Sequence, residues 1–266
     1  FEITLLPSRL ILDAAGQTKN VGMSIINHTE TSFEGKIKFT CYSGIEVKPT
    51  EVDAKIDPLG LEAYVLSVSP VGSPAPGHYA VFVDVGGKAK DWVAVDVPVV
   101  VKKADIRIDG DFGDWKDAAA VSISRILADG GYQTVGKAMF ASDATNFYAA
   151  FEINDAKHVL SADSKSSAHA NPEMDSVQMA FDPLLDGAAG PSGGYKQDDL
   201  EYMLLGAEGG SVMLKTVAGA KPLENATGFD LHFKRDGGKS IYEVAIPWAD
   251  LKIKLEKSKM FAISIL

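Results

Sequence analysis

The feature that most constrains this chain is the regular recurrence of short strand-like segments separated by turn residues. No segment of useful length places apolar residues at i, i+3, i+4 and i+7, the spacing of an amphipathic helix. Alternating apolar and polar residues are clear at 147–153 and 241–246, and clusters of Gly, Pro, Asn and Asp separate such runs. The pattern predicts an all-β protein.

The first hundred or so residues predict an immunoglobulin-like β-sandwich. About seven short strands with turns every 8–12 residues or so are typical of that architecture. The expected strands are 10–12, 21–26, 35–42, 52–56, 63–68, 79–85 and 92–101. This half also resembles the immunoglobulin-like (fibronectin III-like) domains of bacterial surface and glycan-processing proteins, through residues 21–27, 44–49 and 76–79.

A domain boundary is expected at residues 102–105, where a Val-rich strand ends and a new segment opens at Ile106. We therefore predict an immunoglobulin-like domain at 1–103 and a larger, jelly-roll-like β-sandwich at 104–266. The strands expected in the second domain are 121–126, 135–142, 146–153, 176–182, 200–205, 211–216, 228–235, 240–247 and 259–266. Since the last run is apolar to its end, we expect a truncated C-terminus and a fragment of a larger protein.

Composition narrows the classes of partner. The formal net charge is −10 and the pI is about 5.0. A nucleic-acid-binding protein would normally carry a basic stripe, and an acidic surface also disfavours anionic lipid. No run reaches the roughly 18 apolar residues that a membrane span needs. We expect neutral ligands or divalent cations, no nucleic acid and no membrane insertion.

Enzymatic signatures are absent from the sequence. There is no G-x-S-x-G, no H-E-x-x-H and no phosphate-binding glycine loop. Carboxylate pairs are common in any acidic chain, so they do not indicate a glycosidase. The sequence predicts a protein that is not an enzyme.

Four stretches of the second half carry a resemblance to one family. They are IDGDFGDW at 108–115 followed by Ala118, the segment 141–155, DSVQMAFDP at 175–183 with DDLEY at 198–202, and YEVAIPWADL at 242–251. In this order they resemble family 9 carbohydrate-binding modules, which are DOMON-like domains. The tryptophans of the first and last stretches, Trp115 and Trp248, are expected in the core.

The resemblance implies a non-catalytic module that docks glycans for a larger secreted, periplasmic or cell-surface protein. The loops 154–175 and 183–199 are expected to form the site, with Gln178 and Asp175 supplying hydrogen bonds to sugar hydroxyls. Family members place a stacking Trp just before the DSVE segment, but residues 168–174 contain no Trp, Tyr or Phe. His169, Asn171 and Tyr195 are the further expected contacts.

A calcium site is a separate expectation. Asp182, Asp186, Asp198 and Asp199, followed by Glu201, are hard oxygen donors in a Gly-rich span, and calcium takes about six to eight such ligands. A smaller acidic cluster comprises Asp109, Asp111 and Asp114. Zinc is not indicated, because His158 and His169 have no Cys or paired His at short spacing.

Two other functions stay open. Both domains could be structural spacers or interaction domains without a small ligand. Alternatively, the second could resemble the haem-binding relatives of the same fold, which need axial Met, Lys or His donors. The candidates for that role are Met203, Met213, His158 and His169.

Overall fold

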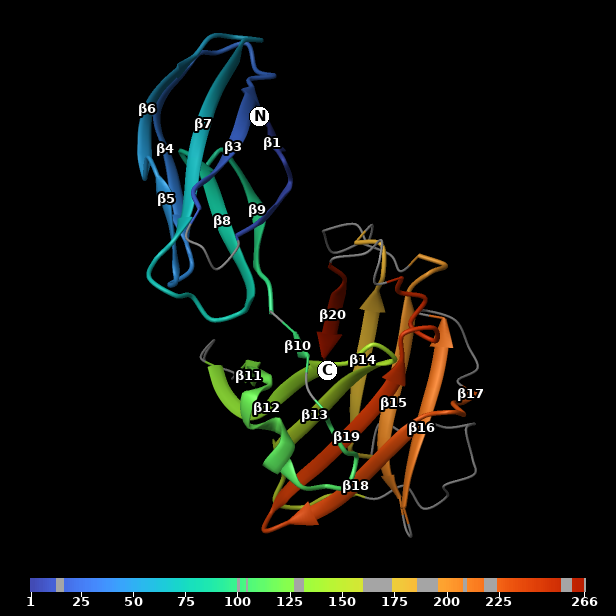
Figure 1. Ribbon diagram of the computed structural model, residues 1–266. Coiled ribbons are helices and arrows are strands. Elements are labelled where there is room, and N and C mark those ends of the chain that lie inside the picture. Colours follow the sequence, from blue (N-terminus) through green and yellow to red (C-terminus); the bar gives the residue numbers. More distant parts are fainter. Residues whose placement is uncertain are drawn as a thin grey trace. The chain divides into compact units, whose positions relative to one another are not determined.

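The computed structural model of the chain shows an almost entirely β protein (Figure 1). It describes residues 1–12, 17–99, 101–103, 105–126, 132–159, 174–185, 196–207, 210–217, 224–254 and 260–265. The chain divides into two compact units, Phe1–Val99 and Val100–Leu266. Within the described ranges no helix is long and apolar enough to cross a membrane. The predicted all-β class is confirmed.

The first unit is an immunoglobulin-like sandwich of two sheets, ordered β1-β3-β7-β5 and β2-β9-β8-β4-β6. Apolar and polar side chains alternate along β3 and β8, so the apolar face of each strand packs into a core shared by the two sheets. Its fully buried residues include Val21, Ile25, Val81 and Val85. The strands are β1 (Glu2–Leu6), β2 (Arg9–Ile11), β3 (Lys19–Ile26), β4 (Phe33–Cys41), β5 (Ile45–Lys48), β6 (Glu51–Ile56), β7 (Leu61–Pro70), β8 (Gly77–Val85) and β9 (Ala89–Val97).

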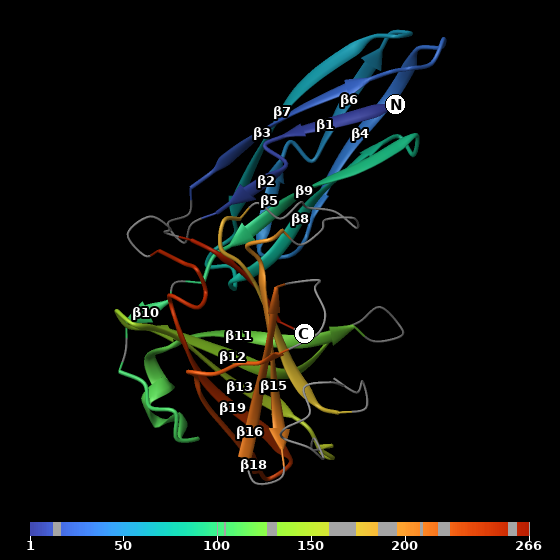
Figure 2. The ribbon, with the colours of Figure 1, turned by 90° about the vertical axis from the view of Figure 1, so that its right-hand side faces the viewer.

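The second unit is a larger sandwich, whose two sheets lie face to face in Figures 1 and 2. One sheet has the order β10-β12-β13-β19-β18, with β11 also paired to β12, and the other has the order β17-β16-β15-β14-β20. Its elements are β10 (Lys102–Lys103), the 3-10 helix η1 (Phe112–Asp117), β11 (Ala119–Ile126), β12 (Tyr132–Ser142), β13 (Asn146–Asn154), β14 (Ser176–Asp182), β15 (Leu200–Ala207), β16 (Gly210–Val217), β17 (Glu224–Asn225), β18 (Asp230–Asp236), β19 (Lys239–Pro247) and β20 (Ala262–Ile265).

A chain of aromatic rings joins the two sheets of the second unit. Phe140 of β12 stacks on Phe147 of β13 with ring centroids 5.8 Å apart. Phe147 meets Phe181 of β14 edge-on at 5.7 Å, and Phe181 meets Tyr202 of β15 at 5.7 Å. Edge-to-face pairs at these separations add to the stability that burial alone supplies. The core of the unit is therefore continuous from one sheet to the other.

The division between the units lies a few residues before the boundary expected from the sequence. Residues Lys102 and Lys103, predicted to end the first domain, form the short strand β10. That strand pairs in parallel with Ala141 and Ser142 of β12. The backbone of the junction is thus part of the second unit's sheet.

Glu243, in the middle of β19, holds the first motif of the second unit onto the outer face of its sheet. The fully buried carboxylate accepts hydrogen bonds from Asp109 N at 3.0 Å, Gly110 N at 2.5 Å and Trp115 Nε1 at 2.9 Å. Burial raises the pKa of Glu243, while these three donors act to lower it. Gly110 has a φ of +80°, and a Cβ there would lie 2.7 Å from the ring of His232. Only glycine fits this turn.

A second, smaller apolar cluster results from this clamp. Trp115 is 2% exposed and packs with Met139, Tyr148, Ala150 and other residues on the sheet face turned away from the main core. The expectation that the two motif tryptophans are core residues is confirmed, because Trp248 is 7% exposed.

We expect Glu243→Ala to lower the free energy of unfolding of the second unit by about 3–5 kcal/mol, because three donors lose a charged acceptor. The measurement is urea denaturation followed by fluorescence in a Trp92→Phe background, which leaves Trp115 and Trp248 as reporters. Glu152→Ala, which removes two partly exposed surface ion pairs, with Lys239 and Lys137, should cost less than about 1 kcal/mol. Equal losses in the two variants would contradict the clamp.

Candidate functional site

The register of the β14–β15 hairpin gathers the predicted calcium ligands at its open end. Phe181 pairs with Leu200, so the next positions outward are Asp182 and Asp199. Single carboxylate oxygens of Asp182, Asp198 and Asp199 all lie within 4.8 Å of one another. The structure therefore brings together three of the four predicted ligands, and Asp186 lies outside the described residues.

The charges of this carboxylate cluster are held close together. Asp199 is only 3% exposed, and its Oδ2 accepts a hydrogen bond from Lys196 N at 2.6 Å. Asp182 Oδ1 accepts one from Leu184 N at 3.2 Å. Asp198 Oδ2 is buried without a hydrogen-bond partner in the described part of the chain. Like charges at this separation repel strongly, and a hard cation with oxygen ligands would offset the repulsion.

Gln178 lies on the outward face of the same sheet. Val177, Met179 and Phe181 alternate into the core, so Gln178 points away from it and is half-buried. Its amide makes no hydrogen bond within the described ranges. Glu201 of β15, opposite Ala180 and hence diagonal to Gln178, shares this face. An amide and a carboxylate in this position can both bind a polar ligand.

Asp175 is placed elsewhere. It lies just ahead of β14, where its Oδ2 accepts a hydrogen bond from Val159 N at 2.5 Å and lies 3.6 Å from His158 Nδ1. The structure does not bring Asp175 and Gln178 to one face, so a single sugar contacting both side chains is not supported. The other predicted contacts, His169, Asn171 and Tyr195, lie outside the described residues.

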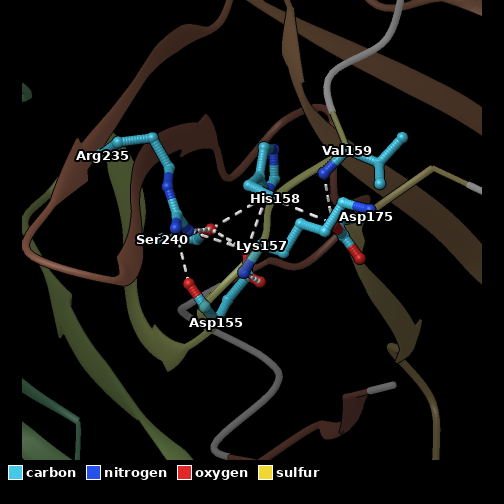
Figure 3. Close-up of polar contacts among 7 residues, drawn as sticks. All are labelled: Asp155, Lys157, His158, Val159, Asp175, Arg235 and Ser240. Atoms are coloured by element: carbon cyan, nitrogen blue, oxygen red, sulfur yellow. Dashed lines mark hydrogen bonds and ion pairs between the residues drawn. The ribbon is translucent and has the colours of Figure 1, made fainter.

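Asp175 instead belongs to a polar network at the end of the sandwich (Figure 3). Asp155 Oδ2 accepts hydrogen bonds from Arg235 Nη1 and Ser240 Oγ, each at 2.8 Å, and lies 2.9 Å from His158 Nδ1. Burial acts to raise the pKa of Asp155, but hydrogen bonds from Ser240 and His158 and the charge of Arg235 lower it overall. Asp155 is therefore held ionised at neutral pH.

Sequence reasoning missed this network because its members come from separate strands and loops. Asp155 follows β13 directly, Asp175 precedes β14, and Arg235 and Ser240 belong to the β18–β19 hairpin. The sequence did show that polar residues directly flank apolar strands, and these flanking positions lie at the same end of the sandwich. Without the sheet order, that signal could not pair them.

The methionines considered for haem ligation face opposite sides of one sheet. Met203 pairs with Leu214, whereas Met213 pairs with Leu204, and directly opposite residues of antiparallel strands share a face. The Nδ1 atom of His158 is engaged with Asp155 and Ser240. These three described candidates do not converge on a common axial position.

Comparison with known proteins gives likeness of fold alone. No protein-family profile matches the chain, and no curated protein matches it. Among solved structures, WR4, a C. elegans MSP family member, is 13% identical, with 36% of this chain and 96% of that chain covered, at a TM-score of 0.27. The E. coli chaperone DraB is 10% identical, with coverages of 58% and 90% and a TM-score of 0.27. These likenesses carry no functional argument.

We expect Arg235→Met to destabilise the second unit by about 1–3 kcal/mol, because Asp155 loses its cation in a largely buried site. Arg235 is 30% exposed, which reduces the effect below that of a fully buried pair. Lys239→Met removes a more exposed pair with Glu152 and should cost under about 1 kcal/mol. Thermal or urea unfolding of both variants measures the difference, and a neutral Arg235→Met would show that the network contributes little.

Proposed function

We propose that this chain is a non-catalytic accessory region of a larger secreted or cell-surface protein and that its second unit binds a glycan. The observation that carries the proposal is the half-buried Gln178 amide on the outward face of β14, which makes no hydrogen bond to the described part of the chain. Sugar hydroxyls both donate and accept hydrogen bonds, and an amide offers both functions. The four motif stretches of the second unit support the same proposal by resemblance.

Glu201 supplies a second group to the same face. Cross-strand diagonal residues lie roughly 7–8 Å apart, within reach of one sugar ring. Its carboxylate makes no ion pair within the described ranges, and therefore it is available as an acceptor. The proposed ligand is a neutral oligosaccharide or polysaccharide, because anionic glycans would be repelled by this carboxylate and by the net charge of −10.

Calcium is proposed as the ion of the carboxylate cluster at Asp182, Asp198 and Asp199. Asp182 ends the strand that carries Gln178, and by alternation both lie on its outward side. The ion would join the two ends of the loop 183–199, one of the two loops that the resemblance assigns to the glycan site. Its role would be to hold that loop beside the sugar-binding face.

One observation favours the spacer alternative. The described outward positions of β14, β15 and β20 include no aromatic residue: they are Ser176, Gln178, Ala180, Asp182, Glu201, Met203, Leu205, Ala207, Ala262 and Ser264. Sugar sites commonly offer an aromatic ring to the apolar side of a pyranose. If the chain binds no glycan, both domains would be interpreted as structural spacers or interaction domains without a small ligand.

We expect the full chain to be retained by at least one neutral glycan on an affinity gel or array. Gln178→Ala should weaken that retention about tenfold, the effect of losing one or two hydrogen bonds. Gln133→Ala makes the same change at an exposed position of β12 in the other sheet and should have no effect. Wild-type protein that binds nothing at millimolar sugar, with calcium or with chelator, would refute the glycan proposal.

We expect one calcium ion to bind per chain and to raise the melting temperature of the second unit. Asp198→Asn should abolish both effects, while raising the melting temperature in chelator because one repelling charge is gone. The control Asp236→Asn changes an exposed carboxylate of β18 and should leave calcium binding intact. Calorimetric titration of chelator-treated protein measures binding, and the absence of heat and of a thermal shift would remove calcium from the proposal.

A further inference from the structure

Three potential metal ligands of mixed type converge at the end of the sandwich shown in Figure 3. They are the Nδ1 atom of His158 and one carboxylate oxygen each of Asp155 and Asp175, and all lie within 4.8 Å of one another. We propose that Asp155, His158 and Asp175 bind a divalent transition-metal ion of the zinc class. The evidence for this metal site does not rest on the proposal of glycan binding.

The spacing of the donors suits a small ion. In a tetrahedral zinc site with bonds of roughly 2.0–2.2 Å, neighbouring ligand atoms lie roughly 3.3–3.6 Å apart. His158 Nδ1 lies 2.9 Å from Asp155 Oδ2 and 3.6 Å from Asp175 Oδ2. The first separation is shorter than this range, the second lies at its upper end, and the two carboxylate oxygens lie within 4.8 Å of each other. Side-chain shifts would therefore convert the hydrogen-bonded cluster into a coordination shell. The fourth position would be open to water or to an external ligand.

The donor set selects the class of ion. Imidazole nitrogen suits zinc, copper and nickel, whereas calcium and magnesium take oxygen ligands. The cluster at Asp182, Asp198 and Asp199 offers oxygen alone, so the two sites should differ in the ions that they bind.

The surroundings fix two of the three ligands. The His158 ring is 3% exposed and stacks on Phe233, with centroids 4.8 Å apart. Asp155 is 17% exposed and is oriented by Arg235 and Ser240. Such outer contacts orient metal ligands and tune their affinity. Asp175 is 46% exposed, so an ion can enter from solvent on its side.

The tautomer of His158 limits the affinity for the ion. A metal ion on Nδ1 requires the imidazole proton to move to Nε2. That atom is buried and makes no hydrogen bond to the residues that the structure describes, so the move leaves a buried N–H without an acceptor among them. The positive charge of Arg235 beside Asp155 works against a cation, and for this reason we expect a dissociation constant in the micromolar range, about 1–10 μM.

An ion at this site would link the segment after β13 to the segment before β14. Asp175 N donates a hydrogen bond to Val159 O at 3.2 Å, and Val159 N donates one to the Asp175 carboxylate. Val159 and Asp175 are therefore direct neighbours in space. By bridging Asp155 and His158 on one side to Asp175 on the other, the metal would tie the end of β13 to the start of β14.

The test is a zinc titration of the chelator-treated full chain by calorimetry, with cobalt(II) absorption as a second readout. We expect one zinc ion per chain, no displacement by millimolar calcium, and a visible cobalt band typical of a four-coordinate site. His158→Gln and Asp175→Asn should each weaken zinc binding at least about tenfold. Asp175→Asn changes a half-exposed side chain, so it keeps the test valid if His158→Gln fails to fold.

The matched controls separate this site from other donors. His28→Gln changes an exposed histidine that contacts Glu2, and Asp53→Asn changes an exposed carboxylate of the first unit; both variants should bind zinc as the wild type does. Two results would overturn the proposal. One is unchanged zinc binding in Asp175→Asn. The other is no binding by the wild type at about 100 μM zinc, which is tenfold the upper limit of the expected dissociation constant.

Discussion

The second unit depends on one buried carboxylate. Glu243 lies in a central strand, where an unpaired charge would be costly, and its cost is offset by three donors that all come from the segment 109–115. This explains why two sequence motifs 128 positions apart occur together: Trp115 needs an acceptor for its indole N–H, and Glu243 needs donors. The clamp also covers part of the outer face of the sheet with Trp115.

The sequence contains enough information for the fold class because alternation is a local property. The apolar positions of β13 and β19 determine which residues face the core, and both strands follow the expected ranges closely. The boundary between the units was less readable, because Lys102 and Lys103 look like a polar linker and yet their backbone pairs with β12. A backbone pairing of two residues leaves no pattern in side-chain polarity.

The candidate sites differ in the same way: one could be predicted from local sequence, and the other depends on contacts between distant segments. The carboxylates Asp182 and Asp199 flank two strands that form a hairpin, so their proximity follows from pairing neighbours in sequence. The partners of His158 could not be found in that way, since Asp155 and Asp175 become neighbours only when the two sheets are stacked. The predicted pairing of Asp175 with Gln178 treated nearby positions as one site, although an extended strand sends them in different directions.

Strand β14 links the two proposed metal sites and the proposed glycan-binding face. Asp175 precedes it, Asp182 ends it, and Gln178 lies between them on the outward face. Each end of the strand therefore adjoins a cluster of possible metal ligands, and from each end departs one of the two segments expected to form the glycan site. Closing a loop costs conformational entropy, and an anchor at its base lowers the entropy that a ligand must still remove when it binds. Ion binding at either cluster should therefore favour ligand binding on the face between them, even though neither ion would touch the ligand.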